Sequence, residues 1–178
     1  MTWDEYFYNI CRDVGANSKC LSKKIGALII KNNYIISTGY NGPPVGCMHC
    51  DNKKHRQYIF NKSQRYIEDL DNLICPRKKM GFNSGEGLEY CSAAHAERNA
   101  ISAAARLGHS TEGATMYTDW IIPCFECAKS IINAGIAEIV VVKLDNYEKT
   151  GITGKYLLEQ AGVKIRKYYR RGDSGDNR

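Results

Sequence analysis

The chain has 178 residues, of which 43% are hydrophobic and 25% are charged, and its formal net charge is +6. These values suit one globular domain with a sizeable core, and so modest a charge is weak support for nucleic-acid binding. No apolar run approaches the roughly 18 residues that span a membrane, and the N-terminus lacks the charged-then-apolar order of a signal peptide, so we expect a cytoplasmic protein.

Residues 2–16 are predicted to form a helix, because apolar side chains recur there near helical spacing. The following segment, "KIGALIIKNNYIISTGYNG", predicts two strands at about 25–30 and 34–38 that are joined by a tight turn at 31–33. Both strands are mostly apolar, which indicates that at least one of them is covered on both faces of a sheet.

Regular patterning breaks down between residues 43 and 90. An unstructured segment of this length is uncommon inside a compact domain, so we expect part of it to be ordered. The stretch "QYIFNKSQRYIEDLDNLI" (57–74) is predicted to supply a helix, and metal binding is expected to tie down the remainder. The segment holds several metal-binding side chains, namely Cys47, His49, Cys50, His55 and Cys75.

Helices and strands alternate from residue 95 onward, which is typical of an α/β domain with a partly parallel sheet. The elements expected are a helix at 95–107, a strand at 113–120, a helix at 124–134, a strand at 137–144, a helix at 154–162 and a strand at 163–169. We therefore predict one domain over residues 1–170, followed by a disordered tail at 171–178.

Cys124 and Cys127 stand three residues apart at the start of a predicted helix that Pro123 introduces, which places both sulfur atoms on one side. In a reducing compartment, the eight cysteines favour metal or catalytic roles over disulfides. A helix N-terminus lowers thiol pKa values, and zinc binds thiolates. With His95, these cysteines supply three ligands and leave one tetrahedral position open, which is the pattern of a catalytic zinc site.

His95 and Glu97 are two residues apart, whereas two metal ligands on one helix are usually three or four apart. We infer that only His95 binds the metal, and that Glu97 beside it moves protons between water and substrate. The segments "HAE" (95–97) and "PCFEC" (123–127) together form the signature of the zinc nucleobase deaminases. The alternative is a core histidine, a surface glutamate and a structural zinc, but a structural site would want a fourth protein ligand.

The segments "GYNGPP" (39–44), "HAERNAI" and "PCFECAKSIINAGI" closely resemble the deoxycytidylate (dCMP) deaminases, particularly those of phages and bacteria. The resemblance runs from about residue 20 to residue 163 and is interrupted at 51–90. It implies a three-layer α/β/α fold like that of cytidine deaminase, with a mixed five-stranded sheet. It also implies hydrolysis of dCMP to dUMP and ammonia, which supplies dUMP for dTMP synthesis.

The resemblance gives roles to further residues. Glu97 would take a proton from water, protonate N3 of the cytosine and later protonate the departing amino group. The backbone amide of Ala96 would orient the base, Asn41 would contact the sugar, and Tyr147 would lie at the phosphate. A turn role for Asn41 and a surface position for Tyr147 remain alternatives.

Many members of this family are hexamers that dCTP activates and dTTP inhibits, with Mg²⁺ accompanying the effector nucleotide. Arg106 falls where the family has an arginine linked to this regulation, and a guanidinium group suits a triphosphate. Gly42, Lys23 and Lys24 are further candidates for the effector site. Equally, Arg106 can interact with the helix dipole, and the paired lysines can belong to a solvated surface.

Some relatives carry a second, structural zinc that ties the segment after "GYNG" to the body of the fold. This chain has Ala93 where at least one relative places a ligand, so the ligand set differs. The alternative is a group of unrelated thiols. The candidate ligands are Cys20, Cys50 and Cys91, with either Cys75 or His49 as the fourth.

Two other functions remain open from the residues alone. A deaminase that acts on dCTP, or on a base in RNA as the tRNA adenosine enzymes do, would share the zinc chemistry, although RNA binding needs a basic groove. A non-catalytic zinc-binding module would have no use for Glu97. We therefore expect an enzyme that binds small deoxynucleotides, forms homo-oligomers, and contacts neither membranes nor nucleic acid.

Overall fold

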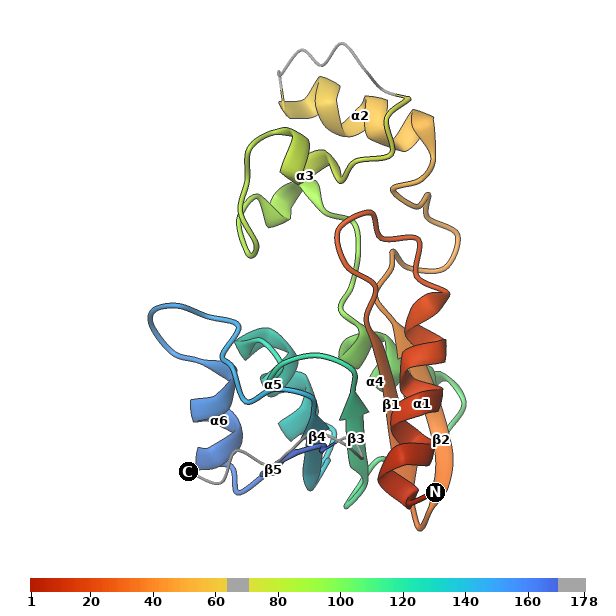
Figure 1. Cartoon of the computed structure of the whole chain (residues 1–178), viewed down its shortest axis with the longest axis vertical. Coiled ribbons are helices and arrows are strands. Elements are labelled where there is room, and N and C mark those ends of the chain that lie inside the picture. Colours follow the sequence, from red (N-terminus) through yellow and green to blue (C-terminus); the bar gives the residue numbers. More distant parts are fainter. Residues whose placement is uncertain (64–70, 170–178) are drawn as a thin grey trace.

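A five-stranded sheet with the order β2-β1-β3-β4-β5 forms the centre of the computed structural model, which describes residues 1–63 and 71–169 (Figure 1). β1 runs antiparallel to β2 and β3, whereas β3, β4 and β5 are parallel to one another. The predicted mixed sheet is confirmed. The strands are β1 (Gly26–Lys31), β2 (Tyr34–Tyr40), β3 (Thr115–Thr118), β4 (Glu138–Val141) and β5 (Lys164–Lys167).

The turn between β1 and β2 follows from its two asparagines. Asn32 and Asn33 have φ angles of 51° and 64°, and Lys31 pairs with Tyr34 on either side of them. Two successive residues with positive φ are typical of a type I′ turn, whose twist matches that of a hairpin, and asparagine tolerates this conformation well. The predicted tight turn at 31–33 is confirmed.

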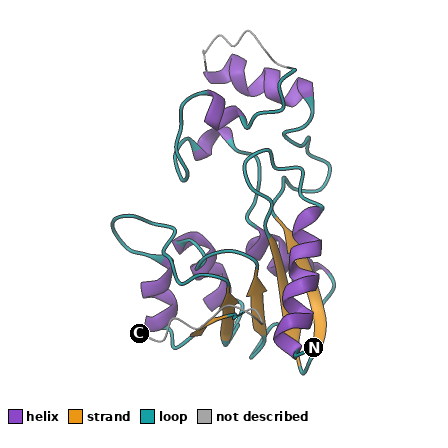
Figure 2. Cartoon of the chain, viewed as in Figure 1, coloured by secondary structure: helices purple, strands orange, loops and turns teal. Residues whose placement is uncertain are grey.

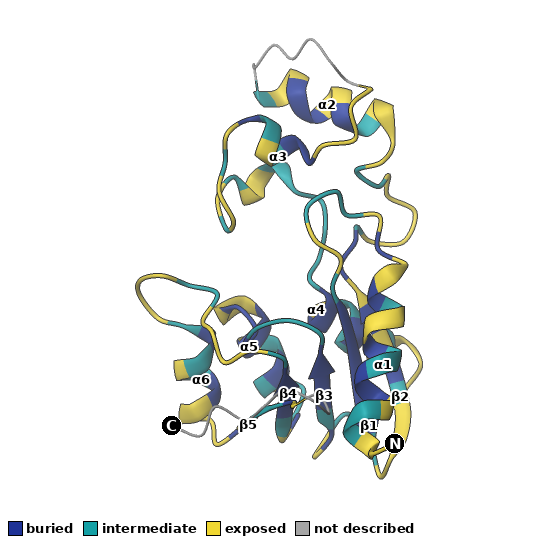
Figure 3. Cartoon of the chain, in the orientation of Figure 1, coloured by how far each residue is buried: buried dark blue, intermediate teal, exposed yellow. Residues whose placement is uncertain are grey.

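Helices cover both faces of the sheet, as Figure 2 shows. Successive residues of β1 point to opposite faces: Leu28 belongs to a core cluster with Phe7 of α1, whereas Ile29 belongs to the cluster that includes residues of α4, α5 and α6. Figure 3 shows the buried strands between helices whose outer faces are exposed. The predicted three-layer α/β/α fold is therefore confirmed. The helices are α1 (Trp3–Ala16) on one face, and α4 (Ala96–Arg106), α5 (Phe125–Asn133) and α6 (Gly154–Gln160) on the other.

An insertion, residues 43–90, leaves the body after β2 and returns before α4 (Figure 1). Its two ends meet at an isolated antiparallel bridge, in which the amides of Gly42 and Ala94 each donate to the other residue's carbonyl, at 3.1 and 2.9 Å. The insertion has a small core of its own around Phe60 and Met80, so it is more than a loop. It contains α2 (Lys53–Ser63), α3 (Pro76–Lys79) and the 3₁₀ helix η1 (Leu88–Tyr90).

The helix predicted at 57–74 is correct only in part. α2 begins earlier, at Lys53, because the side-chain oxygen of Asn52 accepts the backbone N–H of Lys54 at 2.9 Å and caps the helix. The part of the prediction at 64–70 lies outside the described residues, as does the tail at 171–178, and residues 71–74 are not helical. In the described part of the chain, no helix is both long and apolar enough to cross a membrane.

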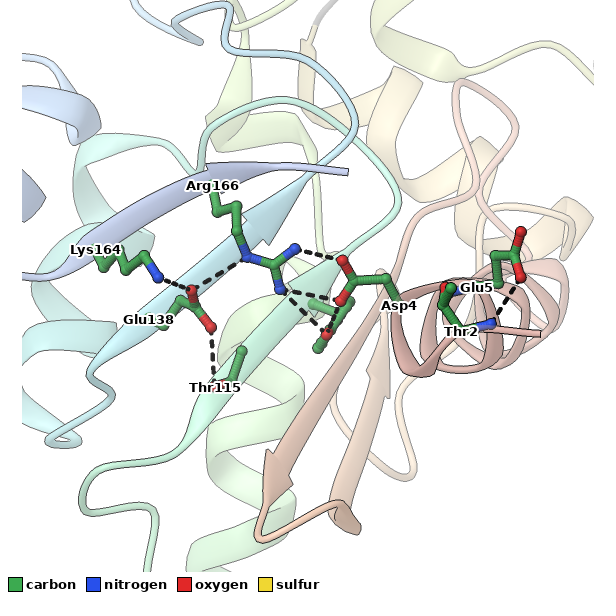
Figure 4. Close-up of polar contacts among 8 residues, drawn as sticks. Thr2, Asp4, Glu5, Thr115, Glu138, Lys164 and Arg166 are labelled. Carbon is green, nitrogen blue, oxygen red and sulfur yellow. Dashed lines mark hydrogen bonds and ion pairs between the residues drawn. The ribbon is translucent and has the colours of Figure 1, made fainter. Parts of the chain in front are cut away.

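A polar network joins α1 to the far edge of the sheet (Figure 4). The guanidinium group of Arg166 on β5 contacts both carboxylate oxygens of Asp4 on α1, with Nη2 and Oδ1 3.0 Å apart. Its Nε lies 3.2 Å from a carboxylate oxygen of Glu138 on β4. The Tyr117 hydroxyl on β3 donates to Asp4 at 2.6 Å. Residues from both ends of the chain are thus held together.

Candidate active site

Two helices begin at the site, each preceded by a residue with an extended backbone. His95 comes directly before α4 and Cys124 directly before α5, yet neither side chain caps the start of its helix. The side chains face each other instead. His95 Nδ1 lies 3.4 Å from the sulfur of Cys124 and 3.3 Å from that of Cys127, in the first turn of α5.

The donor set of these three residues fits a zinc ion. Their ligand atoms all lie within 4.8 Å of one another, and no other group of three His, Cys, Asp or Glu in residues 1–63 and 71–169 is that close. Zinc bonds of about 2.3 Å to sulfur and 2.1 Å to nitrogen imply a nitrogen–sulfur separation of about 3.6 Å in a tetrahedron. The observed separations are close to this value, and three protein ligands leave one position open.

The two thiols of this group differ in protonation. The hydrogen bond with Cys127, together with the neighbouring His95, lowers the pKa of Cys124 to about 4. The same hydrogen bond and burial raise the pKa of Cys127 above its ordinary value. A divalent cation bound here would take both sulfur atoms as thiolates and release any proton that they carry.

Glu97 lies beside the three ligands, in the first turn of α4. It is only 7% exposed, and its carboxylate lies 3.8 Å from the sulfur of Cys127. Burial raises the pKa of this carboxyl group, and the neighbouring His95 opposes the shift. A carboxyl group with a raised pKa can both accept and return a proton near neutral pH. The catalytic role of Glu97 stays a prediction, but its position suits it.

The family model described as the cytidine and deoxycytidylate deaminase zinc-binding region matches residues 1–143. This span contains the complete His95, Cys124 and Cys127 group together with Glu97. The chain belongs to the cytidine and deoxycytidylate deaminase family. The family predicted from the sequence is confirmed.

Individual relatives agree with this assignment. The chain is 38% identical over 166 residues to the deoxycytidylate deaminase of Enterobacteria phage T2, and the match covers 85% of each chain. It is 37% identical over 164 residues to the deoxycytidylate deaminase of Enterobacteria phage T4, and that match covers 85% of this chain and 82% of the relative. The crystal structure of the dCMP deaminase from cyanophage S-TIM5 superposes with a TM-score of 0.62 at 22% identity, over 93% of this chain and 96% of that one. The structural likeness supports the fold.

The "GYNG" motif of this deaminase is fastened to its surroundings by the buried side chain of Asn41. Its oxygen accepts the N–H of Ile25 at 2.8 Å, and its nitrogen donates to the carbonyl of Lys23 at 2.8 Å. A contact with a sugar would have to use the remaining hydrogen or lone pair of the amide, so that role stays a prediction. Ala96 is the first residue of α4, and its N–H is one of the amides without a helical partner.

Tyr147 lies at the predicted site rather than on an open surface. Its ring centroid is 5.9 Å from that of His95, and burial raises the pKa of its hydroxyl. Its ring also faces the insertion, since a Cβ atom at Gly85 would lie 3.6 Å from it. Tyr147 therefore connects the ligand group with the insertion, and its predicted contact with a phosphate is untested.

Two residues that position the site were not predicted. Asn99, one turn after His95, donates from its side chain to the carbonyl of Tyr40 at 2.8 Å and so fastens α4 to the "GYNG" motif. Glu148 accepts the backbone N–H groups of Phe125, at 2.5 Å, and Gly154, at 3.1 Å, which caps the zinc-site helix. Asn99 could have been predicted, because it stands four residues after His95 and therefore lies on the same side of the helix. No sequence pattern indicated a role for Glu148.

Three of the cysteines predicted for a second site affect the pKa of Cys50, but among the described residues no three of these sulfur atoms lie within 4.8 Å of one another. Burial raises the pKa of Cys50 to about 12, with smaller contributions from the thiols of Cys91, Cys20 and Cys75. His49 lies beside Gly42, since its ring would be 3.7 Å from a side chain placed there, and its Nδ1 is buried without a hydrogen-bond partner in the described residues.

The effector candidates do not form one group within the described chain. Arg106 is exposed in the last turn of α4, and the 11 residues of that helix place it roughly 16 Å from the His95 end. Gly42 pairs with Ala94 at the His95 end. The ammonium group of Lys24 donates to the carbonyl of Ala16 at the end of α1, at 3.2 Å. Lys23 lies over the ring of Trp120.

Proposed function

We propose that this chain catalyses the zinc-dependent hydrolysis of dCMP to dUMP and ammonia. The observation that carries the proposal is the buried carboxyl group of Glu97 beside a group of only three metal ligands, which leaves room for water. The phage T2 and T4 relatives named deoxycytidylate deaminases support the choice of substrate. A zinc ion held by His95, Cys124 and Cys127 would activate water as a nucleophile.

The residues of this chain would move the protons. Glu97 accepts a proton from the attacking water and gives it to N3 of the cytosine as the C4–oxygen bond forms. It then carries the second proton of that water to the amino group, which leaves as ammonia when the C4–nitrogen bond breaks. The Ala96 amide holds the base, while Asn41 and Tyr147 contact the sugar and the phosphate.

Ammonia release from dCMP by zinc-loaded protein tests the proposal, with dCTP and a tRNA anticodon stem-loop as competing substrates. Turnover of dCMP with little or no turnover of the others supports it. Preference for dCTP would change the substrate within the same chemistry, and deamination of the RNA would favour the base-in-RNA alternative. No turnover of any substrate, with zinc bound at the three ligands, would overturn the proposal and favour a non-catalytic zinc module.

Regulation by nucleotides belongs to the same proposal. We expect a cytoplasmic homohexamer that dCTP activates and dTTP inhibits, with Mg²⁺ bound to the effector, so that dUMP supply for dTMP synthesis follows demand. Arg106, Gly42, Lys23 and Lys24 are the effector candidates. The rate with and without dCTP and Mg²⁺, together with the mass in solution, tests these points, and a rate indifferent to both nucleotides would remove the regulatory part alone.

A second, structural zinc would fasten the insertion to the body. The thiols of Cys20, Cys75 and Cys91, which affect the pKa of Cys50, support a sulfur site, because thiolates are good zinc ligands. Two zinc ions per chain, falling to one in Cys91→Ser with dCMP turnover retained, are expected. One zinc ion per wild-type chain would contradict the second site.

A further inference from the structure

The segment between β4 and α6, residues 142–153, is a loop (Figure 1), and it carries Tyr147 to the candidate active site. The Tyr147 ring contacts two other parts of the molecule. Its centroid is 5.9 Å from that of the His95 ring, and a Cβ atom at Gly85 of the insertion would lie 3.6 Å from it. The position of this ring therefore depends on what holds the loop in place.

Backbone hydrogen bonds do not hold the middle of this loop. The carbonyl group of Asp145 accepts a backbone N–H before this stretch, and that of Thr153 accepts one after it. Between them, no backbone group of residues 146–152 bonds to another backbone group of the described chain. Packing is also incomplete, because Ile152 is 60% exposed and a hollow of about 420 Å³ lies between this stretch, α5 and α6. The stretch therefore depends on its side chains for attachment.

The carboxylate of Glu148 provides that attachment at two points. One oxygen accepts the N–H of Phe125, the first residue of α5, at 2.5 Å, and the other accepts the N–H of Gly154, the first residue of α6, at 3.1 Å. The two helix starts are adjacent, since a Cβ atom at Gly154 would lie 1.9 Å from the carbonyl oxygen of Pro123. One carboxylate can therefore bind an N–H group at the start of each helix, where such groups lack a helical partner.

The charge of Glu148 is held by these N–H groups rather than by a cation. No lysine or arginine in residues 1–63 and 71–169 forms an ion pair with it, and Lys129, which lines the same hollow, pairs with Glu126 at 2.8 Å. Hydrogen bonds from N–H groups to a carboxylate are about twice as strong as those between neutral groups. A glutamine side chain has one oxygen, so it would accept one N–H and turn its own NH₂ group toward the other.

These contacts connect Tyr147 to the candidate metal ligands by a short path. Glu148 directly follows Tyr147 in the chain. Its partner Phe125 directly follows Cys124, so a single hydrogen bond links the two stretches. We propose that Glu148 is a positioning residue that keeps the Tyr147 ring beside His95 by fastening its loop to the starts of α5 and α6. The inference rests on the proposed function, in which Tyr147 contacts the substrate.

The first experiment measures kcat and KM for dCMP in Glu148→Gln, in Tyr147→Ala and in the double variant. Glu148→Gln should raise the KM about tenfold, because a hydrogen bond to a charged group contributes about this much or more to an equilibrium. Its kcat should stay within about threefold of wild type, since Glu97 lies on α4 and not on this loop. The KM of the double variant should equal that of Tyr147→Ala, because residues that act through one another are not additive.

Glu126→Gln is the matched control, because Glu126 is a carboxylate at the same end of α5 that pairs with Lys129 instead of the loop. It should leave kcat and KM unchanged. Losses that multiply in the double variant overturn the proposal, because Glu148 would then act independently of Tyr147. An unchanged KM in Glu148→Gln overturns it as well. So does a fall in zinc content, because Glu148 would then act through Cys124.

Limited proteolysis tests the attachment of the loop without any substrate. Lys149 is exposed and directly follows Glu148. Cleavage by trypsin after Lys149, located by mass spectrometry, should be faster in Glu148→Gln than in wild type and in Glu126→Gln, because a segment that opens more often is cut more often. Equal rates of cleavage after Lys149 in the three proteins overturn the proposal.

Calorimetric titration with dUMP separates this inference from the proposed function, because it needs no turnover. Weaker binding of dUMP by Glu148→Gln than by wild type, with no further loss when Tyr147→Ala is already present, supports the positioning role even if dCMP is not deaminated. Equal affinity of wild type and Glu148→Gln for dUMP overturns it even if dCMP is deaminated.

Discussion

His95 and Glu97 are close in sequence, but their side chains take different directions because α4 begins between them. His95 has an extended backbone, with φ −70° and ψ 156°, so its ring can turn away from α4 toward the two cysteines. Glu97 already lies within the first turn, and its carboxyl group is carried into the buried space beside Cys127. The start of α4 thus separates the proposed metal ligand from the proposed proton carrier.

Replacing Glu97 by glutamine should abolish turnover while keeping the metal. Glutamine has nearly the same shape but cannot accept the proton of water, and positioned general acid–base catalysis is worth about 10²–10⁴-fold in rate. Zinc content by atomic absorption and kcat for dCMP are the two readouts. A Glu97→Gln protein with normal zinc and a rate within threefold of wild type would remove Glu97 from the mechanism.

Replacing Cys124 by serine should remove activity and the zinc ion of the candidate active site, because a hydroxyl group is a poor ligand for zinc compared with a thiolate. Since a bound metal stabilises the folded state, added zinc should raise the Tm of this variant less than that of wild type. Cys47→Ser is the control, because Cys47 is an exposed thiol outside both cysteine groups. Full zinc occupancy in Cys124→Ser would contradict the ligand assignment.

The contact between β2 and α4 depends on the absence of a side chain at Gly39. A Cβ atom at this position would lie 2.4 Å from the backbone nitrogen of Ala100 and 2.4 Å from the carbonyl oxygen of Ala96. Both atoms belong to the helix backbone, so they cannot move without shifting α4. This close approach is what brings the start of α4, and with it His95, to the edge of the sheet.

Gly39→Ala should therefore be destabilising and should impair the site. Forcing an extra carbon into a packed contact costs about 1–3 kcal/mol, which corresponds to several degrees of Tm in a protein of this size. Gly42→Ala is a fair comparison for stability, since its Cβ would meet the nearest atom, on the Tyr40 ring, at 3.5 Å. Equal Tm values for the two variants would contradict this prediction, because they would show that α4 shifts to accommodate the Cβ atom at residue 39 without loss of stability.

Elements with a clear apolar run or turn motif were predictable from the sequence. Short helices without such a pattern, and helix starts that depend on one capping residue, were not. The apolar runs of β1 and β4 and the asparagine turn gave clear local signals. α3 has only four residues and η1 three, so neither has a hydrophobic repeat to detect. The start of α2 depended on one capping residue, Asn52, in a stretch without periodicity.

The whole molecule is held together by contacts that no local pattern encodes. Asp4 and Arg166 are ordinary charged residues in the sequence, and only the order of the strands brings them together. The zinc ligands were predictable at this scale because their chemistry demands that they meet.

The contact between Asp4 and Arg166 should make stability depend on pH. The hydrogen bond from Arg166 lowers the pKa of Asp4 below its ordinary value of 3.8. The contribution of this contact to the free energy of unfolding is therefore fully present above about pH 4. It is lost as the pH falls through the lowered pKa of Asp4 in the folded state. Asp4→Asn should lower the Tm at pH 7 by a few degrees at most, because the pair is partly exposed and worth about 1 kcal/mol or less.

The difference in Tm between wild type and Asp4→Asn should shrink as the pH is lowered below 4 and as salt is added. Asp13→Asn serves as the control, since the side chain of Asp13 is 77% exposed and lies 4.0 Å from Arg12. A constant difference at all pH values would mean that the carboxylate charge of Asp4 contributes nothing.

The bridge between Gly42 and Ala94 has a consequence for how such chains diversify. Because the insertion leaves and returns at one point, its length and content can change without displacing any strand of the sheet. During evolution, the insertion can thus be exchanged as one contiguous segment while the candidate metal ligands of the body are kept. The same piece reaches the Tyr147 ring at Gly85, so the contacts beside the site can change by recombination as well as by point mutation.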